Sequence, residues 1–436
     1  MIKKLNIKRT FIIGLAFFTI LMMWQVYNNY CPLFLNNLLQ KHFGEGNYDY
    51  IVGLIMAVDN VLGLFMLPLF GMLSDKTKSK LGKRMPYIIV GTLITSFVFP
   101  FIPFLFLKNN LVGVVVLMGI VLVSMNAYRN PAVALMPDVT PKPLRSKANA
   151  IINLVGYIGA IFAGLIAMFF KYDSNSIIIP FALTSVFMIG ALVVLVLKIK
   201  ENKLQEQLKD ELLEGEKQSQ ALDDTQNQTL GKDNKKNLWL MVVSVFLWFF
   251  SFNAIETFWS TYSELYLNIS MWSLGTIVMT ISCMLSFLLG SFLTNKLGRK
   301  KVVMIGLITL ISTMSLSFIV GELIPKNTTG IPFLFFVLIF LFLVSGIGWA
   351  FVNVNSYPMV VELSNKNNIG KFTGYYYTAS MLAQSITPVA VGFVLAFIGY
   401  KMLFAYSAFF MALALLVFAF VKTKTNKKQE KKEKEN

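Results

Sequence analysis

The chain has 436 residues, of which 56% are hydrophobic and 14% charged, with a formal net charge of +17 and a mean hydropathy of +0.64. This composition excludes an ordinary soluble domain, and the positive charge lies in short loops instead of the broad basic face that a nucleic-acid-binding protein needs. We therefore expect a protein embedded in a lipid bilayer, without a nucleic-acid partner.

Twelve apolar stretches have about the length that crosses a membrane. A bilayer core about 30 Å thick takes roughly 20 apolar residues for each helical crossing. In chain order the stretches are 11–35, 50–73, 87–107, 111–136, 148–170, 176–197, 238–262, 271–294, 302–321, 331–358, 373–398 and 402–421. No small-residue cleavage site follows the first stretch, so we interpret it as a retained helix. The sequence predicts an all-α, polytopic membrane protein with 12 transmembrane helices.

Basic residues alternate along the loops. They cluster before the first stretch, after the second, fourth and eighth, and after the last, whereas Lys108 and Lys401 stand alone in two of the intervening loops. Because positively charged loops stay on the cytosolic side, the sequence predicts a multi-pass protein of the cell membrane with both termini in the cytosol.

A polar segment divides the twelve stretches into six and six. We expect it to be a flexible cytosolic linker, although Leu204 to Leu213 could form a surface helix. The predicted organisation is a six-helix bundle at 1–198, the linker at 199–236, a second six-helix bundle at 237–421 and a basic cytosolic tail at 422–436.

The two halves carry related spacings. Asp138 ends the fourth stretch nine residues before Lys147, and Glu362 ends the tenth stretch nine residues before Lys371. The loop after the second stretch also matches the loop after the eighth, where Gly298 begins a similar Gly-Arg-Lys run. Parallel six-plus-six repeats are typical of secondary transporters that bind substrate at the midplane between the halves.

Two motifs resemble the major facilitator superfamily. The first is Gly71-x-x-Ser74-Asp75 followed by Gly82-Lys83-Arg84-Met85-Pro86-Tyr87, and the second is Ala134-Leu135-Met136-Pro137-Asp138 followed by Ala148-Asn149-Ala150. Within the superfamily they resemble the sucrose-type transporters and the glycoside–pentoside–hexuronide cation symporters. The resemblance implies the major facilitator fold and cation-coupled transport of a glycoside or disaccharide.

The chain departs from the sodium-coupled melibiose-type permeases of that branch. Those proteins carry paired aspartates just before a Pro-x-x-Gly, whereas Pro68 and Gly71 are here preceded by Leu67. Asp59 lies more than two turns upstream. This departure favours H⁺ over Na⁺ as the coupling cation.

Two carboxyl groups are candidates for proton coupling. Asp59 lies about nine residues into the second stretch, near the midplane, and Glu256 lies within the seventh. Ionisable groups inside a membrane are costly and usually face a cavity. The alternatives are a structural Asp59, hydrogen-bonded by Asn60, and a Glu256 that reaches water at the outer surface.

Polar residues of the seventh stretch recur at helical spacing. Asn253, Glu256, Thr257, Ser260 and Ser263 are three or four residues apart, so they share one helical face. Such a face suits hydrogen bonds to sugar hydroxyls, and the neighbouring Trp259 could offer an aromatic face to a pyranose ring.

Other intramembrane polar residues predict the rest of a central cavity, because an unpaired amide against lipid is costly. Arg129 could pair with Asp59, bind a sugar hydroxyl or reach the cytosolic surface, and the repeat places Asn353 opposite it. The remaining candidates are Gln25, Asn28, Asn126, Asn130, Tyr377 and Gln384.

Charges at the cytosolic helix ends are candidates for a gate. In the superfamily that the chain resembles, such charges close the inner side through ion pairs and helix dipoles. The candidates are Asp75, Arg84, Asp138, Arg145, Lys147, Glu362 and Lys371. The alternative is that they only set the topology, and we favour the gate role for Asp75 and Asp138.

The sequence predicts a transporter and not an enzyme, with two alternative functions. No Gly-x-x-x-x-Gly-Lys-Ser/Thr run appears, and Cys31 and Cys283 lie in apolar stretches, so we expect no ATP-driven transport, cofactor or metal site. We expect a monomer with a small sugar and H⁺ as ligands. The alternatives are a drug or metabolite exporter on the same scaffold, and a lipid-handling or sensor protein with a transporter fold.

Overall fold

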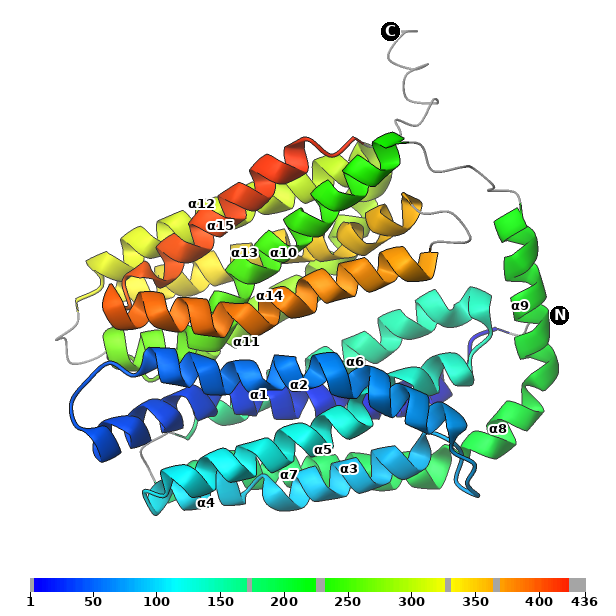
Figure 1. Ribbon diagram of the computed structural model, residues 1–436, viewed down its shortest axis with the longest axis horizontal. Coiled ribbons are helices and arrows are strands. Elements are labelled where there is room, and N and C mark those ends of the chain that lie inside the picture. Colours follow the sequence, from blue (N-terminus) through cyan, green and yellow to red (C-terminus); the bar gives the residue numbers. More distant parts are fainter. Residues whose placement is uncertain (1–3, 171–174, 225–231, 326–330, 364–368, 423–436) are drawn as a thin grey trace, which may run out of the picture.

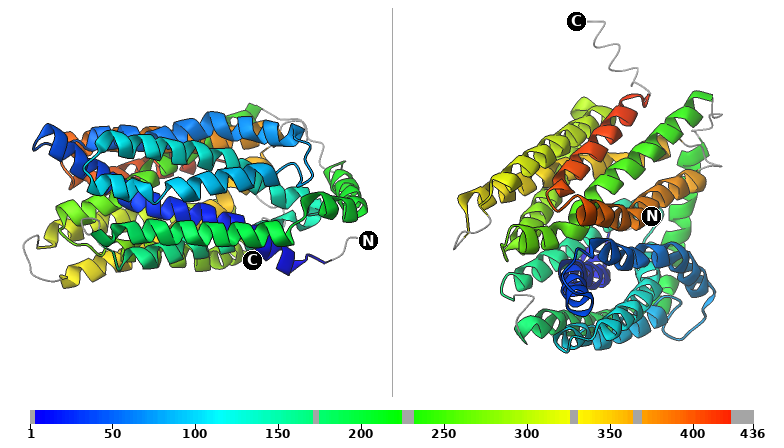
Figure 2. Two further views of the ribbon diagram at one scale, coloured as in Figure 1. Left: turned by 90° about the horizontal axis from the view of Figure 1, so that it is seen from below. Right: turned by 60° about the vertical axis from the view of Figure 1, so that its left-hand side comes forward.

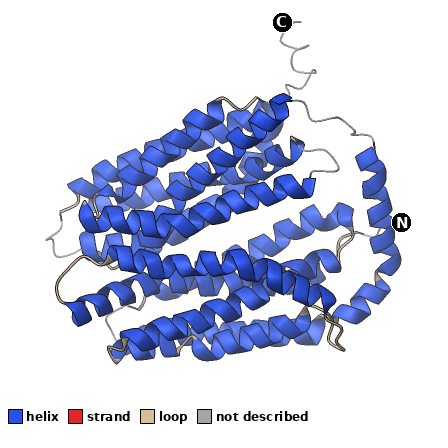
Figure 3. Cartoon of the chain, in the orientation of Figure 1, coloured by secondary structure: helices blue, strands red, loops and turns tan. Residues whose placement is uncertain are grey.

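A computed structural model describes residues 4–170, 175–224, 232–325, 331–363 and 369–422. Every regular element in these ranges is a helix (Figure 3). Twelve helical segments, the third made of two consecutive helices, are long and apolar enough to cross a membrane. The predicted all-α fold with twelve membrane-spanning helices is therefore confirmed for the described part of the chain.

The helices form two bundles that lie one above the other (Figures 1 and 2). The first bundle contains α1 (Ile7–Phe43), α2 (Asp49–Lys76), α3 (Met85–Val98), α4 (Phe101–Leu107), α5 (Leu111–Asp138), α6 (Arg145–Ala167) and α7 (Ile178–Lys198). The second contains α10 (Lys232–Thr261), α11 (Trp272–Leu297), α12 (Arg299–Leu323), α13 (Phe333–Glu362), α14 (Ile369–Phe397) and α15 (Met402–Ala419). Short helical turns occupy Lys142–Leu144, Asn175–Ile177 and, as a π-helical turn after α10, Tyr262–Tyr266. We call the two bundles the N half and the C half.

The third crossing is two helices instead of one. The sequence predicts a single stretch at 87–107, but α3 ends at Val98 and α4 begins at Phe101. Pro100 lies at the junction. Because proline has no backbone N–H to donate, it interrupts the hydrogen-bond ladder there.

The segment between the halves contains two helices, α8 (Glu201–Gln207) and α9 (Lys209–Asp224). The sequence favours a flexible linker here and leaves a surface helix as the alternative. Leu204 and Leu208, one helical turn apart, pack against the hydrophobic core and give this segment a partly buried face. Residues 225–231 of the linker, and the basic tail beyond Lys422, lie outside the described residues. We call the end of the molecule that carries α8 and α9 the linker end.

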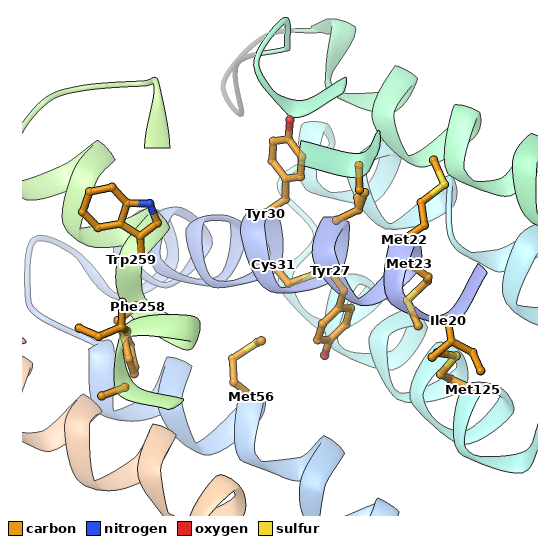
Figure 4. Close-up of a cluster of buried hydrophobic side chains, with 14 of the residues drawn as sticks. Ile20, Met22, Met23, Tyr27, Tyr30, Cys31, Met56, Met125, Phe258 and Trp259 are labelled. Carbon is orange, nitrogen blue, oxygen red and sulfur yellow. The ribbon is translucent and has the colours of Figure 1, made fainter. Parts of the chain in front are cut away.

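Helix α1 lies at the centre of the packed interior (Figure 4). Tyr27 and Tyr30 point to opposite sides of it, and both are fully buried. The hydroxyl of Tyr30 donates to the carbonyl of Phe170 at 2.9 Å, and its ring meets Trp272 of the C half edge-on at 5.3 Å. Helix α1 therefore joins the N half to the C half at the end opposite the linker.

Helices α2 and α14 lie side by side at that opposite end and diverge towards the linker end (Figure 1). The Tyr400 hydroxyl donates to Asp49 Oδ1 at 2.6 Å, and Asn47 Nδ2 donates to the Leu395 carbonyl at 3.0 Å. Gly53 allows the closest approach, because a Cβ there would lie 2.7 Å from the Pro388 carbonyl carbon. The halves are thus closed against each other opposite the linker.

We expect Gly53→Val to force α2 and α14 apart. Overpacking a close contact typically costs about 1–3 kcal/mol, so the closed arrangement should lose most of its population. Spin labels are attached at Glu45→Cys and Lys401→Cys, in a background without the two native cysteines. Double electron–electron resonance should then report a longer distance between the two labels in Gly53→Val. Gly374→Val is the control, because a Cβ at Gly374 meets nothing within 4 Å. An unchanged distance in Gly53→Val would contradict this account of the contact.

Candidate functional site

A cavity of about 310 Å³ lies between the two halves. Helices α1 and α6 of the N half line it together with α10, α11, α13 and α14 of the C half. Its polar and aromatic lining residues include Trp24, Gln25, Asn28, Tyr157, Phe249, Phe252, Asn253, Glu256, Trp259, Thr276, Thr280, Trp349, Asn353 and Gln384. Both halves therefore contribute to one partly polar space.

One wall of the cavity is aromatic. The rings of Phe252 and Trp349 stack in parallel with centroids 3.7 Å apart, and Phe249 meets Trp349 edge-on at 5.4 Å. These contacts fix the orientation of the indole, which remains half-buried. The wall presents a rigid apolar surface to a ring-shaped ligand.

Amide side chains provide hydrogen-bonding groups around that wall. Asn253 donates to the backbone carbonyl of Gln384 at 3.2 Å, and the Gln384 amide donates to the Ser380 carbonyl at 3.1 Å. Asn353 donates to the Trp349 carbonyl at 2.9 Å. Because each bond uses one N–H, the amide oxygens are left to accept hydrogen bonds from a ligand.

Glu256 is the acidic residue among the described residues that line the cavity. It sits on α10 between Asn253 and Trp259, and its side chain is exposed although neighbouring side chains of the same helix are buried. The exposure is to the cavity. A carboxylate in this position can accept two hydrogen bonds from ligand hydroxyls or exchange a proton with cavity water.

A second charged group lies beside the cavity in the N half. Asn126 Nδ2 of α5 donates to Asp59 Oδ1 of α2 at 3.4 Å, and Arg129 interacts electrostatically with both Asp59 and Glu256. The Arg129 guanidinium lies 5.9 Å from the centre of the Trp24 ring, which lines the cavity. Two acids on opposite halves therefore share the field of one guanidinium.

The structure brings seven of the sequence candidates together at the cavity and places the others elsewhere. The lining candidates are Gln25, Asn28, Asn253, Glu256, Trp259, Asn353 and Gln384. Asp59, Asn126 and Arg129 form the neighbouring charged group. Asn130 instead donates to the Leu67 carbonyl, and Tyr377 is 52% exposed, beside Tyr357 and Tyr376.

The predicted polar face of α10 is divided. Thr257, Ser260 and Ser263 are buried, and they do not belong to the cavity lining. Ser260 and Ser263 lie beyond Trp259, towards the end where the halves meet. Ser263, in the π-helical turn, donates to the carbonyl of Ile269, which follows that turn, at 2.7 Å. Trp259 is a wall of the cavity, 1% exposed, with its N–H donated to the Trp272 carbonyl at 2.7 Å.

Sequence reasoning missed the aromatic wall and the hydroxyls of α11. Trp349 precedes Asn353 by one helical turn, and Thr276 precedes Thr280 by the same interval. These i, i+4 pairs carry a weak signal for a shared face. It was not distinctive in an apolar helix, because tryptophan and threonine are ordinary membrane residues.

Three of the five predicted gate residues of the N half, Asp75, Arg84 and Asp138, form one charged cluster at the linker end. Arg84 is 5% exposed, and its guanidinium bonds Asp75, the Ser74 hydroxyl and, at 2.8 Å, Asp138. Lys83 also pairs with Asp138 at 3.1 Å. The loop after α2 is thereby tied to the end of α5.

Glu201 at the start of α8 binds the backbone next to this cluster. Its carboxylate is fully buried and accepts hydrogen bonds from the backbone N–H groups of Lys83, Arg84 and Met85 at 2.9–3.2 Å. Gly82, with φ of 112°, packs against the same side chain. An anion at the first turn of α3 complements the helix dipole and satisfies N–H groups that have no partner within the helix.

The C half carries an equivalent ion pair. Arg299 Nε donates to Glu362 Oε1 at 2.7 Å, which joins the start of α12 to the end of α13.

The remaining gate candidates form no ion pair with the Arg84 cluster among the described contacts. Arg145 donates to the carbonyls of Pro137, near the end of α5, and of Thr140, just after it. Lys147 is exposed, and the Lys371 ammonium lies 5.8 Å from the centre of the Tyr375 ring.

These ion pairs stabilise each half separately. Asp138 pairs with Lys83 and Arg84 within the N half, as Asp75 does with Arg84, and Arg299 pairs with Glu362 within the C half. The halves diverge at this end (Figure 1), so the pairs do not lock them together in this conformation.

Two bundles of six membrane-spanning segments each, around a central polar cavity, are the architecture of a secondary transporter. The profile of the Major Facilitator Superfamily matches residues 13–297 and 272–436, and the chain belongs to this family. It is a multi-pass membrane transporter and not an enzyme.

Solved structures of several transporters share the fold. A D-xylose-proton symporter has a TM-score of 0.72 at 14% identity, over 96% of this chain and 98% of that one. The inward open xylose transporter XylE from E. coli has a TM-score of 0.71 at 14% identity, over 97% of each chain. The nucleoside transporter NupG has a TM-score of 0.64 at 15% identity, over 96% of this chain and 100% of that one. No curated protein matches the chain in sequence.

Proposed function

We propose that this transporter carries a glycoside or disaccharide together with H⁺ by alternating access. The observation that carries the proposal is the central cavity, which combines an aromatic wall, several amides and one carboxyl group. The sequence motifs that resemble the sucrose-type and glycoside–pentoside–hexuronide symporters support the same substrate class. We place the protein in the cell membrane as a monomer with both termini in the cytosol.

The chemistry of the cavity suits a sugar. A pyranose has two apolar faces rimmed by hydroxyls, so it can stack on Trp349 while Asn253, Asn353 and Gln384 accept its hydroxyl protons. The volume of about 310 Å³ lies at the lower end of the roughly 300–1,000 Å³ range of small-molecule sites. An exporter of lipophilic compounds would be expected to have a more apolar cavity, with fewer amide side chains.

The arrangement of the halves fits one state of an alternating-access cycle. They meet at the end opposite the linker and diverge at the linker end (Figure 1). With the basic linker end in the cytosol, this conformation would be inward-facing. The Arg84 cluster and the Arg299–Glu362 pair would then meet the opposite half in the outward-facing state and serve as the inner gate.

Asp59, Arg129 and Glu256 offer a route for proton coupling. With both acids ionised, the three groups carry a net charge of −1, whereas one bound proton makes them neutral. A neutral group is cheaper to enclose in the membrane interior than a charged one. Closure around the substrate would therefore favour the protonated state, which couples H⁺ to the sugar.

We expect Trp349→Ala to weaken sugar binding by up to about tenfold, because an aromatic contact is worth roughly 0.5–1.5 kcal/mol. The measurement is equilibrium binding of sucrose, maltose, trehalose, D-xylose and uridine to the purified protein. Trp349→Phe should retain part of the affinity. Trp239→Ala, at a tryptophan that is 57% exposed and outside the cavity, is the control. Tight binding of uridine alone would replace the sugar proposal with a nucleoside.

A further inference from the structure

A second, larger cavity lies on the outer side of the N half, away from the C half. This groove has a volume of about 750 Å³ and runs between α3 and α5, with Phe70 of α2 at its side. Figure 1 shows α3 at the edge of the molecule farthest from the C half. Because its walls belong to membrane-spanning helices, the groove faces lipid.

The groove is apolar along its length and has polar groups at one end. Val90 is 57% exposed and Val116 is 53% exposed on its walls. The hydroxyls of Thr77 and Tyr87 lie at the linker end, where they hydrogen-bond each other at 2.9 Å. A tyrosine hydroxyl is typical of the membrane–water interface.

The lining of the groove is staggered along two antiparallel helices. It runs from Pro86 to Ile94 on α3 and from Val116 to Ala127 on α5. Gly91 of α3 lies against Ser124 and Tyr128 of α5, so Val116 lies farther from the linker end than Ile94 does. From the level of Pro86 to that of Val116 the lining covers about 15 residues, or about 23 Å at 1.5 Å per residue. The groove therefore extends from the linker-end surface past the middle of a hydrocarbon core about 30 Å thick.

Positive charge lies directly beyond the polar end. Lys76, Lys78 and Lys80 are exposed in the loop that follows α2, next to Thr77. Lys83 and Arg84 of the same loop are already bonded to Asp138. The three exposed lysines are thus positioned to meet an anion at the membrane surface, at the mouth of the apolar groove.

We propose that this groove binds one acyl chain of an anionic glycerophospholipid from the leaflet at the linker end, with its phosphate held by Lys76, Lys78 and Lys80. The apolar walls take the chain, and the lysines select the charged head group. Bound in this way, the lipid would bridge α3, α5 and the loop that carries Arg84. The site is separate from the central cavity and does not depend on what that cavity transports.

Gly119 offers a way to fill the groove without disturbing the helices. It lines the groove on α5, and a Cβ there would meet nothing within 4 Å. Gly190 of α7 has the same open surroundings but lies outside the groove. Gly119→Leu and Gly190→Leu therefore form a matched pair, and Val116→Phe is a second filling variant.

The test is native mass spectrometry of the full chain in detergent with equal amounts of phosphatidylglycerol and phosphatidylcholine. We expect one phosphatidylglycerol to be retained in preference, and Gly119→Leu and Val116→Phe to lower its retention by about tenfold. The Lys76→Gln, Lys78→Gln, Lys80→Gln triple variant should lose the preference over phosphatidylcholine. Gly190→Leu and a Lys296→Gln, Lys301→Gln control should behave as wild type.

Three results would overturn the proposal. Unchanged retention in both filling variants would show that the groove is not the site. Equal retention of the two lipids by the wild type would show that the lysines select no head group. A dimer that Gly119→Leu dissociates, with no retained lipid, would show that a second copy of the chain covers the groove. Matching unfolding temperatures of Gly119→Leu and Gly190→Leu confirm that the comparison is between folded proteins.

Discussion

Asp59→Asn is expected to abolish proton-driven accumulation of sugar while sugar exchange across the membrane continues near the wild-type rate. An asparagine resembles the protonated carboxyl group, so the site is held in the form that is able to close around substrate. The coupling free energy between two ligands is typically about 1–3 kcal/mol, or roughly 5–150-fold in affinity, and the variant should lose all of it. Uphill uptake and counterflow of labelled sugar in liposomes give the two readings.

Glu256→Gln is the comparison that assigns the roles of the two acids. Because Glu256 lines the cavity and Asp59 does not, we expect this variant to lower sugar affinity and exchange together. Exchange in Asp59→Asn should also lose the part of its pH dependence that titration of Asp59 supplies. If Glu256→Gln kept exchange and lost only accumulation, the coupling role would pass from Asp59 to Glu256.

Glu201→Gln is expected to destabilise the linker end of the N half. The carboxylate is fully buried and accepts hydrogen bonds from three successive backbone N–H groups. Glutamine removes the charge and turns one acceptor into a donor that faces those N–H groups. Hydrogen bonds to charged groups contribute about 1.5–3 kcal/mol, so the loss should be of that size.

Hydrogen exchange of the amides of Lys83, Arg84 and Met85 measures this effect where it arises. They should exchange faster in Glu201→Gln by a factor of about 10–150, which corresponds to that free energy. Glu206→Gln is the control, because Glu206 is an exposed residue of the same helix α8. Equal exchange in the two variants would show that α8 does not hold the Arg84 loop.

The fold was predictable because bilayer length and loop charge are strong constraints on a membrane chain. Twelve apolar stretches match twelve membrane-spanning segments, and the paired motifs appear in space as the Arg84–Asp138 and Arg299–Glu362 ion pairs. The break between α3 and α4 was not predicted, since Pro100 was not distinguished from prolines that remain inside helices, such as Pro68.

The site was predictable in part, because an amide or carboxyl group inside a membrane is costly unless it faces a cavity or has a hydrogen-bonding partner. This reasoning found Glu256, Asn353 and Gln384 at the cavity, but it could not separate them from Asn130 and Tyr377, which lie elsewhere. Helical periodicity places a residue on a face and does not say how far along the helix the cavity extends. A single sequence does not reveal packing between distant segments. Such packing produces the aromatic wall, the hydrogen bonds that Glu201 accepts and the Tyr400–Asp49 hydrogen bond.

The most direct test of sugar–proton symport uses purified protein in liposomes that enclose a pH-sensitive dye. Sucrose, maltose or trehalose is added outside, with no existing ion gradient. The account predicts internal acidification that requires a particular sugar and disappears in Asp59→Asn. Entry of labelled sugar without acidification would contradict proton coupling, and entry of none of the sugars would contradict the proposed substrate class.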